Sequence, residues 1–313
     1  MWYNIDMRFR ILILAIACVL SSCVFAPSRK EFANVYFNLG NAYMRLGEAD
    51  NAARAFLKAA EYDKKFGAAN FNLAKSYIMA ERYGDALDVL DGLAEQDPEN
   101  GTILAAQAYC YYKLENREKA FELYLQILER EPDNYAARFN YASLLAEEGY
   151  LPEAMETYQQ LEVFPDSATD AQLYFEMAKV SYSAEDYEKA VQYGEKALSL
   201  DTDNIEIDRF LLRPYEQGEY YAKFLETADV VIDYNLAHDS NVKNSENAEL
   251  YFKKCDIYLN HTGNFSQGAA QLKKAIAAGF EDKDKLKDLY DNKELLNSDE
   301  IRSIIDKSGL LKK

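Results

Sequence analysis

The chain has 313 residues, of which 49% are hydrophobic, so it is long enough to bury a sizeable core. It contains only 13 glycines and 6 prolines, too few for a fold of many short strands joined by turns. The formal net charge of −18 repels a phosphate backbone and therefore disfavours general binding to nucleic acids.

The N-terminal segment has the pattern of a bacterial secretory signal. Arg8 and Arg10 precede an apolar run over residues 11–20, about half of what a membrane-spanning helix needs. The run ends in Leu20-Ser21-Ser22-Cys23, which resembles the lipobox of bacterial lipoproteins. This resemblance implies that residues 1–22 are a signal peptide, that cleavage falls just before Cys23, and that its thiol receives a diacylglyceryl group and further acyl chains such as palmitate.

Residues 23–32 are predicted to be the lipidated N-terminus and a short tether. Residues 24–29 reach about 20 Å at most, so the helices that follow should lie close to the membrane. Val24 stands where an Asp would resemble an inner-membrane retention signal, so we favour the periplasmic side of the outer membrane over the inner membrane. The signal would work equally well from Met1 or from Met7.

Residues 33–204 carry a repeat of 34 residues. Alanine recurs at this spacing at positions 52, 86, 120 and 154, and again at 190 after 36 residues. The first unit reads Tyr36-x-x-Leu39-Gly40-x-x-Tyr43, followed by Gly47, Ala52, Phe56 and Ala59. This pattern resembles the tetratricopeptide repeat, with Tyr36 in place of its tryptophan. It predicts five units, at residues 33–66, 67–100, 101–134, 135–168 and 171–204.

The resemblance implies an all-α fold, in which antiparallel helix pairs stack into a right-handed superhelical solenoid. The two helices of a pair approach closely only if small residues stand where they cross. Such residues recur in the first helix of each unit, at Gly40, Ala74, Ala108, Ala142 and Ala178. One pair cannot bury its apolar face alone, so neighbouring pairs must stack.

The pattern weakens after residue 204. Residues 205–280 are predicted to form two degenerate units, with Pro214 interrupting the first helix and a polar loop at 235–247. Residues 281–313 are predicted to form a helical cap over the last apolar face, its second helix opened by Asn297 with Glu300 as a capping box.

No motif indicates catalysis, a cofactor or a metal. The sequence lacks a phosphate-binding glycine loop, a G-x-S-x-G turn and an H-E-x-x-H pair. The four cysteines match no zinc or redox spacing, and Cys110 and Cys255 are predicted to be free buried thiols. We therefore expect a protein that is not an enzyme.

In the tetratricopeptide family the first helix of each unit lines a concave binding face. The corresponding positions in this sequence are aromatic with a few cations, and the predicted binding residues are Phe37, Asn41, Phe71, Lys75, Tyr109, Tyr112, Phe139, Phe175, Lys179 and Tyr182. Exposed aromatics beside lysines suit a peptide or helix of a partner protein. The alternative is that the phenylalanines simply pack against neighbouring units.

One binding mode of the family should be absent. Repeats that clamp a C-terminal carboxylate need three cations, and here Phe37, Thr102 and Ala106 stand in their places, although Asn41 and Asn72 match the two asparagines.

Two functions follow from the sequence. The first is a lipid-anchored, non-catalytic adaptor or scaffold that binds an envelope protein or peptide in the bacterial cell envelope. The alternative is a transport-associated periplasmic lipoprotein that docks a solute-binding protein and holds a small hydrophobic ligand.

Overall fold

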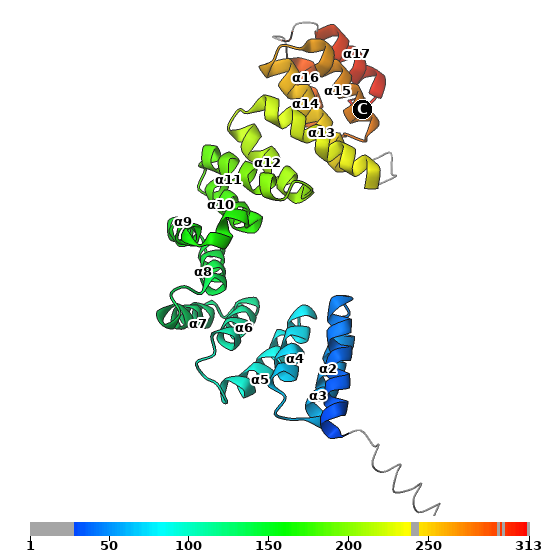
Figure 1. Ribbon diagram of the computed structural model, residues 1–313. Coiled ribbons are helices and arrows are strands. Elements are labelled where there is room, and N and C mark those ends of the chain that lie inside the picture. The colour runs from blue at the N-terminus through cyan, green and yellow to red at the C-terminus, as the bar shows by residue number, and fades with distance from the viewer. Residues whose placement is uncertain (1–27, 239–243, 293–294, 296–297, 312–313) are drawn as a thin grey trace, which may run out of the picture. The chain divides into compact units, whose positions relative to one another are not determined.

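The structure is a computed structural model that describes residues 28–238, 244–292, 295 and 298–311. These residues form helices joined by short turns, and none of them lies in a β-strand (Figure 1). The predicted all-α fold is confirmed. The chain divides into two compact units, residues 1–144 and 145–313, so that the division falls inside helix α8. The described helices include none that is long and apolar enough to cross a bilayer.

The described part of the first unit contains three helix pairs and most of helix α8. Their bounds are α2 (Arg29–Arg45) with α3 (Ala49–Tyr62), α4 (Gly67–Met79) with α5 (Tyr83–Ala94), α6 (Gly101–Lys113) with α7 (Arg117–Arg130), and α8 (Tyr135–Glu147). Cys23, the predicted lipidation site, lies outside the described residues.

Helix α2 begins earlier than the sequence pattern predicted. It starts at Arg29, so residues 29–32 are helical and the predicted tether at 23–32 is too long. The reason is a capping box at Ser28. Its hydroxyl accepts a hydrogen bond from the Glu31 N–H, and its own N–H donates to the Glu31 carboxylate.

The second unit also consists mainly of helix pairs, with short 3-10 and π-helical turns among them. Helix α9 (Leu151–Gln159) is followed by two 3-10 turns, η1 (Gln160–Val163) and η2 (Pro165–Thr169). The later pairs are α10 (Ala171–Ser183) with α11 (Tyr187–Leu200), α12 (Ile205–Gln217) with α13 (Tyr221–His238), and α14 (Ser245–Asp256) with α15 (Phe265–Ala277). A π-helical turn, η3 (Ile257–His261), extends α14, and α16 (Lys283–Asp291) and α17 (Ser298–Ser308) follow.

The turn inside each helix pair has the same geometry along the chain. The second residue after the first helix adopts positive φ. The backbone N–H of the residue that follows it donates to a carbonyl in the last turn of that helix, as from Arg82 to Tyr77 at 2.8 Å. Glycine holds the positive-φ place at residues 47, 149 and 263, but glutamate holds it at 81, 115, 185 and 219. From Gly47 to Glu219 this positive-φ residue recurs every 34 or 36 residues, so the turns repeat with the same period as the sequence.

The small residues of the repeat stand where the helices cross. The alanines at 74, 108, 142 and 178, and those at 52, 86, 120, 154 and 190, are all fully buried. Gly40 shows why size matters, since a Cβ there would lie 2.6 Å from the ring of Phe56, which is itself fully buried.

Pro214 does not interrupt a helix, and that prediction was wrong. Helix α12 runs through it from Ile205 to Gln217. A proline there removes a single intrahelical hydrogen bond near the helix end. The buried side chains of Leu211 and Tyr215 hold the helix on both sides of it, and the Gly218 N–H still donates to the Pro214 carbonyl at 2.9 Å.

The predicted loop at 235–247 is also wrong at both of its ends. Helix α13 continues to His238 and α14 begins at Ser245, while residues 239–243 lie outside the described residues. Asn235 and Asn247 are buried, and the Asn235 side-chain amide donates to Asn247 Oδ1 at 2.9 Å. Polar composition alone predicts a loop at these residues. In the structure the two asparagines instead hydrogen-bond each other between neighbouring helices.

The last two helices cover an apolar core of α14 and α15. Leu286 and Leu289 of α16 and Ile301 and Ile305 of α17 are buried in one cluster with Cys255. Asn297, the predicted cap of the last helix, lies outside the described residues.

Candidate protein-binding surfaces

In the first unit, two of the predicted binding phenylalanines are part of the packing. Phe37 is half-buried, and its ring centroid lies 5.7 Å from that of Phe56 and 4.8 Å from that of Phe66. Phe71 is half-buried against the apolar core around Leu90. These two rings therefore pack within the repeats, which was the alternative that the sequence left open. Phe139, on α8, is half-buried as well.

The two asparagines of the would-be carboxylate clamp bind each other. Asn72 Nδ2 donates to Asn41 Oδ1 at 3.0 Å, which links α4 to α2. Ser76 lies one turn further along α4, and its hydroxyl is 3.3 Å from the sulfur of Met44. The side-chain amides of Asn41 and Asn72 are therefore already hydrogen-bonded to each other.

Two predicted binding residues of the first unit, Tyr109 and Tyr112, lie together on α6. The Tyr109 ring is 37% exposed, and the Lys113 Nζ lies 5.5 Å from its centroid and 5.4 Å from that of Tyr112. The ring of Tyr83 lies edge-on to Tyr109, with centroids 6.2 Å apart. Lys75 is exposed on α4. Tyrosines beside a lysine form an amphipathic patch suited to a protein surface.

In the second unit the first helices of three successive pairs, α10, α12 and α14, line a groove of about 770 Å³ together with Phe224 of α13. The lining residues are Phe175, Lys179, Glu206, Arg209, Phe210, Leu212, Arg213, Glu216, Phe224, Glu246, Glu249, Leu250 and Lys253. We call this cavity the α10–α14 groove. It brings together two of the predicted binding residues, Phe175 and Lys179, with side chains that the sequence argument did not name.

Aromatic rings form one wall of the α10–α14 groove. The rings of Phe175 and Phe210 meet edge to face, with centroids 5.4 Å apart, and the ring of Tyr182 lies 6.0 Å from that of Phe210. The Lys179 Nζ lies 4.3 Å from the Phe175 centroid and 2.8 Å from the Glu176 carboxylate. The wall is thus apolar and held in place by ring contacts between α10 and α12.

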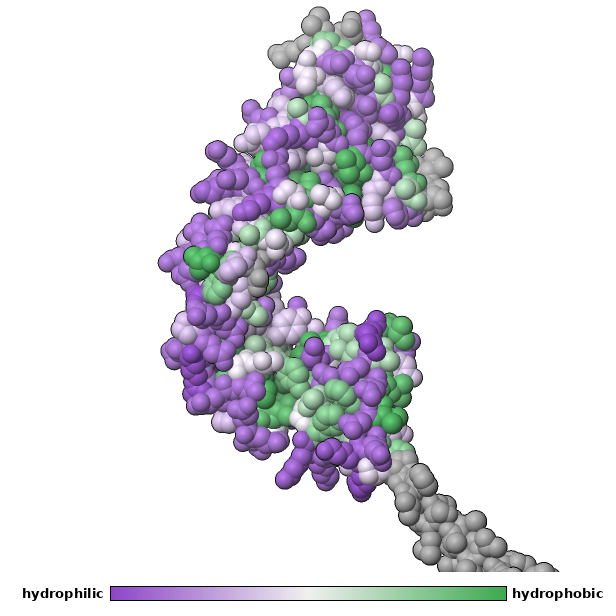
Figure 2. All heavy atoms as spheres, in the orientation of Figure 1, coloured by the Kyte–Doolittle hydropathy of each residue, from purple (hydrophilic) through white to green (hydrophobic). Residues whose placement is uncertain are grey.

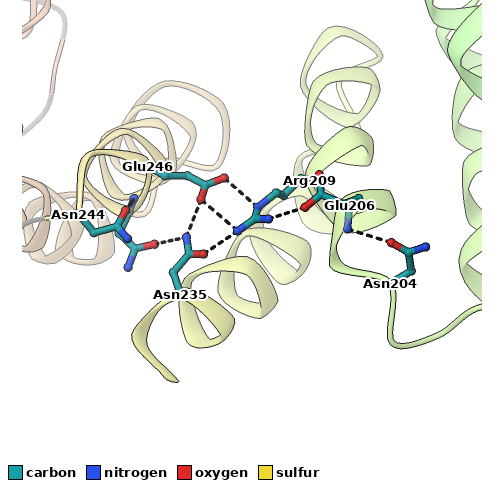
Figure 3. Close-up of polar contacts among 7 residues, drawn as sticks. Asn204, Glu206, Arg209, Asn235, Asn244 and Glu246 are labelled. Carbon is teal, nitrogen blue, oxygen red and sulfur yellow. Dashed lines mark hydrogen bonds and ion pairs between the residues drawn. The ribbon is translucent and has the colours of Figure 1, made fainter. Parts of the chain in front are cut away.

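A polar network joins α12, α13 and α14 beside this wall (Figure 3). The Arg209 guanidinium pairs with Glu206 at 2.6 Å and with Glu246 at 3.2 Å, and it donates to Asn235 Oδ1 at 2.9 Å. Asn235 in turn donates to Glu246 at 2.7 Å. The network fixes the first turn of α14 against α12.

The remaining charges of the groove are nearly all paired. Lys253 forms an ion pair with Glu216, and Glu249 with Lys285. Within the described part of the chain, Arg213 is the one charged lining residue without such a partner, and its side chain is exposed. A ligand in the groove would therefore meet one unpaired guanidinium, that of Arg213, among side chains that already form ion pairs.

The groove residues that were not predicted occupy the same positions within their helices as those that were. The resemblance to the tetratricopeptide family implies binding positions at the second, fifth, ninth, twelfth and thirteenth residues of each first helix, and four of these positions recur in the groove. Counted from Ile205 they give Glu206, Arg209, Arg213 and Glu216, and counted from Ser245 they give Glu246, Glu249 and Lys253. No binding residue was predicted beyond residue 204, because the repeat pattern of core residues weakens there, although the helix pairs continue.

The described residues contain no group of three or more His, Cys, Asp or Glu side chains that could hold a metal ion. The two thiols are buried: burial raises the pKa of Cys110 to about 11 and that of Cys255 to about 12. Both stay protonated near neutral pH, which makes them poor nucleophiles.

Models of the tetratricopeptide repeat match residues 37–101, 105–168 and 171–204, just over half of the chain. A search of curated proteins found no match. Several solved structures share the fold. A tetratricopeptide repeat protein from Parabacteroides merdae is 16% identical, with 88% of this chain and 98% of that chain covered and a TM-score of 0.52.

The C-terminal part of a repeat-containing protein from Cytophaga hutchinsonii is 13% identical, with 80% and 98% covered and a TM-score of 0.60. PilF from Pseudomonas aeruginosa is 18% identical, with 72% and 99% covered and a TM-score of 0.56. These likenesses agree with the helix pairs, the turn geometry and the family-model matches, and the chain belongs to the tetratricopeptide repeat family.

Proposed function

We propose that this protein is a non-catalytic adaptor of the bacterial cell envelope, which is anchored through a lipid on Cys23 and binds a partner protein in the α10–α14 groove. The family is one of protein-binding scaffolds, and the lipobox-like sequence before Cys23 supports the anchor. The single observation that carries the binding role is the groove itself, with its aromatic wall and one free guanidinium.

The chemistry of the groove indicates the kind of segment it accepts. The edges of Phe175 and Phe210 offer an apolar contact for an aromatic or aliphatic side chain. Arg213 offers a bidentate contact for a carboxylate, the geometry in which guanidinium groups bind most strongly. We infer that the partner presents an extended or helical segment with an apolar side chain next to an acidic one.

The alternative function, holding a small hydrophobic ligand, is less well supported. Eight of the thirteen lining residues are charged. Sites for small apolar ligands are lined mainly by hydrophobic and aromatic side chains. A groove of this composition suits a polypeptide, whose backbone and polar side chains can use the rim.

One protein of the same fold is a pilus biogenesis factor. PilW, described as a widely conserved type IV pilus biogenesis factor, is 18% identical, with 71% of this chain covered and a TM-score of 0.56. At that identity the likeness concerns the fold and not the partner. It does provide a precedent for this fold in the assembly of an envelope structure.

Site-specific photo-crosslinking in intact cells tests the binding role. A photoreactive phenylalanine analogue at Phe210 should form an adduct with one partner, which mass spectrometry identifies. The same analogue at Tyr150, which is 53% exposed and outside the groove, is the matched control. Equal adducts from both positions would contradict binding in the groove.

The affinity of the identified partner then tests the chemistry. Phe175→Ala with Phe210→Ala should weaken binding by about 30-fold, since central aromatic residues contribute about 2 kcal/mol or more. Arg213→Glu should weaken it as well, and more at low salt than at high salt. Leu125→Ala, 45% exposed on α7, is the control and should leave the affinity unchanged.

The anchor is tested separately. Cys23→Ala should release the protein from the membrane fraction, and the mass of the mature N-terminus should show acylated Cys23 in the wild type. An N-terminus that begins at Met1 without acylation would contradict the anchor and would leave the groove proposal intact.

A further inference from the structure

Helix α2 has an apolar face that no described part of the chain covers. Phe32, Val35 and Leu39 follow one another at spacings of three and four residues, so they share one side of the helix, and Leu46 continues the register. Their exposed fractions are 38%, 61%, 41% and 70%. Figure 2 shows hydrophobic residues gathered over α2.

This face is not the packing side of α2. The fully buried residues of the helix are Ala33 and Gly40, and Gly40 faces the Phe56 ring of α3. Ring contacts hold the Phe32 end of this apolar face. The ring of Tyr62 at the end of α3 stacks on Phe32, with centroids 5.3 Å apart, and on Tyr36 at 5.6 Å. Ring contacts therefore hold Phe32 against α3, and Val35, Leu39 and Leu46 continue the exposed apolar face along the helix.

The same stretch is free of negative charge. The sixteen residues from Phe32 to Gly47 contain no Asp or Glu, and Arg45 is their only charged residue. The whole chain carries 53 acidic residues and a net charge of −18. Most of its surface is thus repelled by anionic lipid headgroups, whereas the exposed side of α2 is not.

The position of the predicted anchor brings this face to a bilayer. Five residues, 24–28, separate Cys23 from the first residue of α2. They span about 18 Å when fully extended. A lipid on Cys23 therefore keeps the start of α2 next to the headgroups, and the exposed face is the side of the helix that gains most from contact with them.

We propose that the exposed face of α2, formed by Phe32, Val35, Leu39 and Leu46, rests in the headgroup region of the membrane. This inference depends on the lipid anchor of the proposed function. The membrane is then bound at two points, the acyl chains and the first helix, and the first repeat has a fixed orientation on it. The spacing of the four side chains would also suit another helix, so a second copy of the chain is the competing occupant.

Tryptophan fluorescence tests this proposal cleanly. Trp2 is the only tryptophan and precedes the expected cleavage site, so the mature protein should contain none. Val35→Trp places a reporter on the apolar face. Leu125→Trp, on α7 in the same unit and 45% exposed, is the matched control. Both variants are purified with their native lipid and reconstituted into phosphatidylcholine–phosphatidylglycerol vesicles, with and without brominated acyl chains.

The proposal predicts that the emission of the Val35→Trp variant shifts to shorter wavelength and loses about half its intensity in brominated vesicles, because an interfacial helix lies about 5–10 Å deep. The emission of the Leu125→Trp variant should not change. Adding Leu39→Glu to Val35→Trp should abolish the quenching while the protein still sediments with the vesicles.

The outcomes separate this inference from the anchor. Wild-type protein that shows Trp2 emission or fails to sediment with vesicles contradicts the anchor. If the Val35→Trp variant sediments but its emission stays unquenched at long wavelength, the α2 proposal alone is overturned. A blue shift without quenching, together with crosslinks between copies, overturns it in favour of a second copy.

Discussion

The two units hold their helix pairs together by different means. In residues 29–144 the crossing points are small apolar residues against large ones, as with Gly40 and Phe56 or the fully buried Ala74 and Ala108. Single polar links also occur there, as from Asn72 to Asn41 and from the buried Gln107 to Asp91. In residues 145–311 the small-residue contacts persist, but a buried lysine and a polar network that joins three helices are added. Lys254 is only 2% exposed and pairs with Asp229, and Asn235 links Arg209 to Glu246.

The difference shows what a repeat can and cannot specify. A small residue at each crossing serves every pair alike, so it recurs with the period of the chain. A polar network needs several complementary side chains from different helices, and it forms once. The second unit also carries the α10–α14 groove, so the polar network lies beside the candidate binding site.

The largest expected effect tests whether the units open independently. Leu90→Ala and Ile305→Ala each remove a fully buried side chain, from the cluster of Cys110 and from that of Cys255 respectively. Each should lower the local opening free energy by about 2–5 kcal/mol.

Alkylation of the two thiols at pH 8, followed by mass spectrometry, reads out each unit. Both thiols are fully buried, and burial raises their pKa to about 11 and about 12, so labelling requires opening. Leu90→Ala should accelerate the reaction of Cys110 only, and Ile305→Ala that of Cys255 only. If either variant accelerated both alike, the chain would open as one cooperative unit.

The next effect concerns the buried lysine of the second unit. Lys254 pairs with the exposed Asp229 carboxylate and donates to the Leu225 carbonyl at 3.4 Å. Lys254→Ala should cost about 2 kcal/mol of unfolding free energy in urea, mostly because the aliphatic stem no longer fills its place. Lys254→Met keeps that stem and should cost less than half as much. A methionine variant as unstable as the alanine variant would show that the charge dominates.

A double-mutant cycle measures the polar network. Arg209 and Glu246 are 30% and 42% exposed, so solvent screens their ion pair in part. Arg209→Ala and Glu246→Ala should show a coupling of about 0.5–1 kcal/mol at low salt that shrinks at high salt. The exposed Lys58–Glu61 pair of α3 is the comparison in the first unit and should show a coupling near zero. Equal couplings in both units would contradict the view that polar side chains contribute more to the second unit.

The smallest effect should be the same in both units, because the turn is the same. Glu81 in the first unit and Glu185 in the second adopt positive φ, at 58° and 60°. Glycine has no Cβ penalty there, so Glu81→Gly and Glu185→Gly should each raise the unfolding free energy by about 0.5 kcal/mol in urea titrations. Gly47→Ala, at φ 75°, should lower it by a similar or larger amount. A loss on substitution by glycine would mean that the glutamate side chains stabilise their turns.

The sequence by itself determined the periodic part of this protein. The 34-residue spacing, the small residues at the crossings and the family of the fold depend on contacts that every pair repeats, so one pattern describes them all. Part of the candidate site also followed: Phe175, Lys179 and Tyr182 were named from their places in the repeat, and they do lie at or beside the groove.

Only the tertiary structure decided the rest. Whether Phe37 faces a ligand or its neighbours depended on Phe66, which lies just before α4, and whether Asn235 lies in a loop depended on Asn247 and Arg209. Pro214 stays helical because buried neighbours on both sides outweigh one lost hydrogen bond. In each case the deciding contacts are with side chains that pack around the residue in the folded chain, and a local sequence pattern does not reveal those contacts.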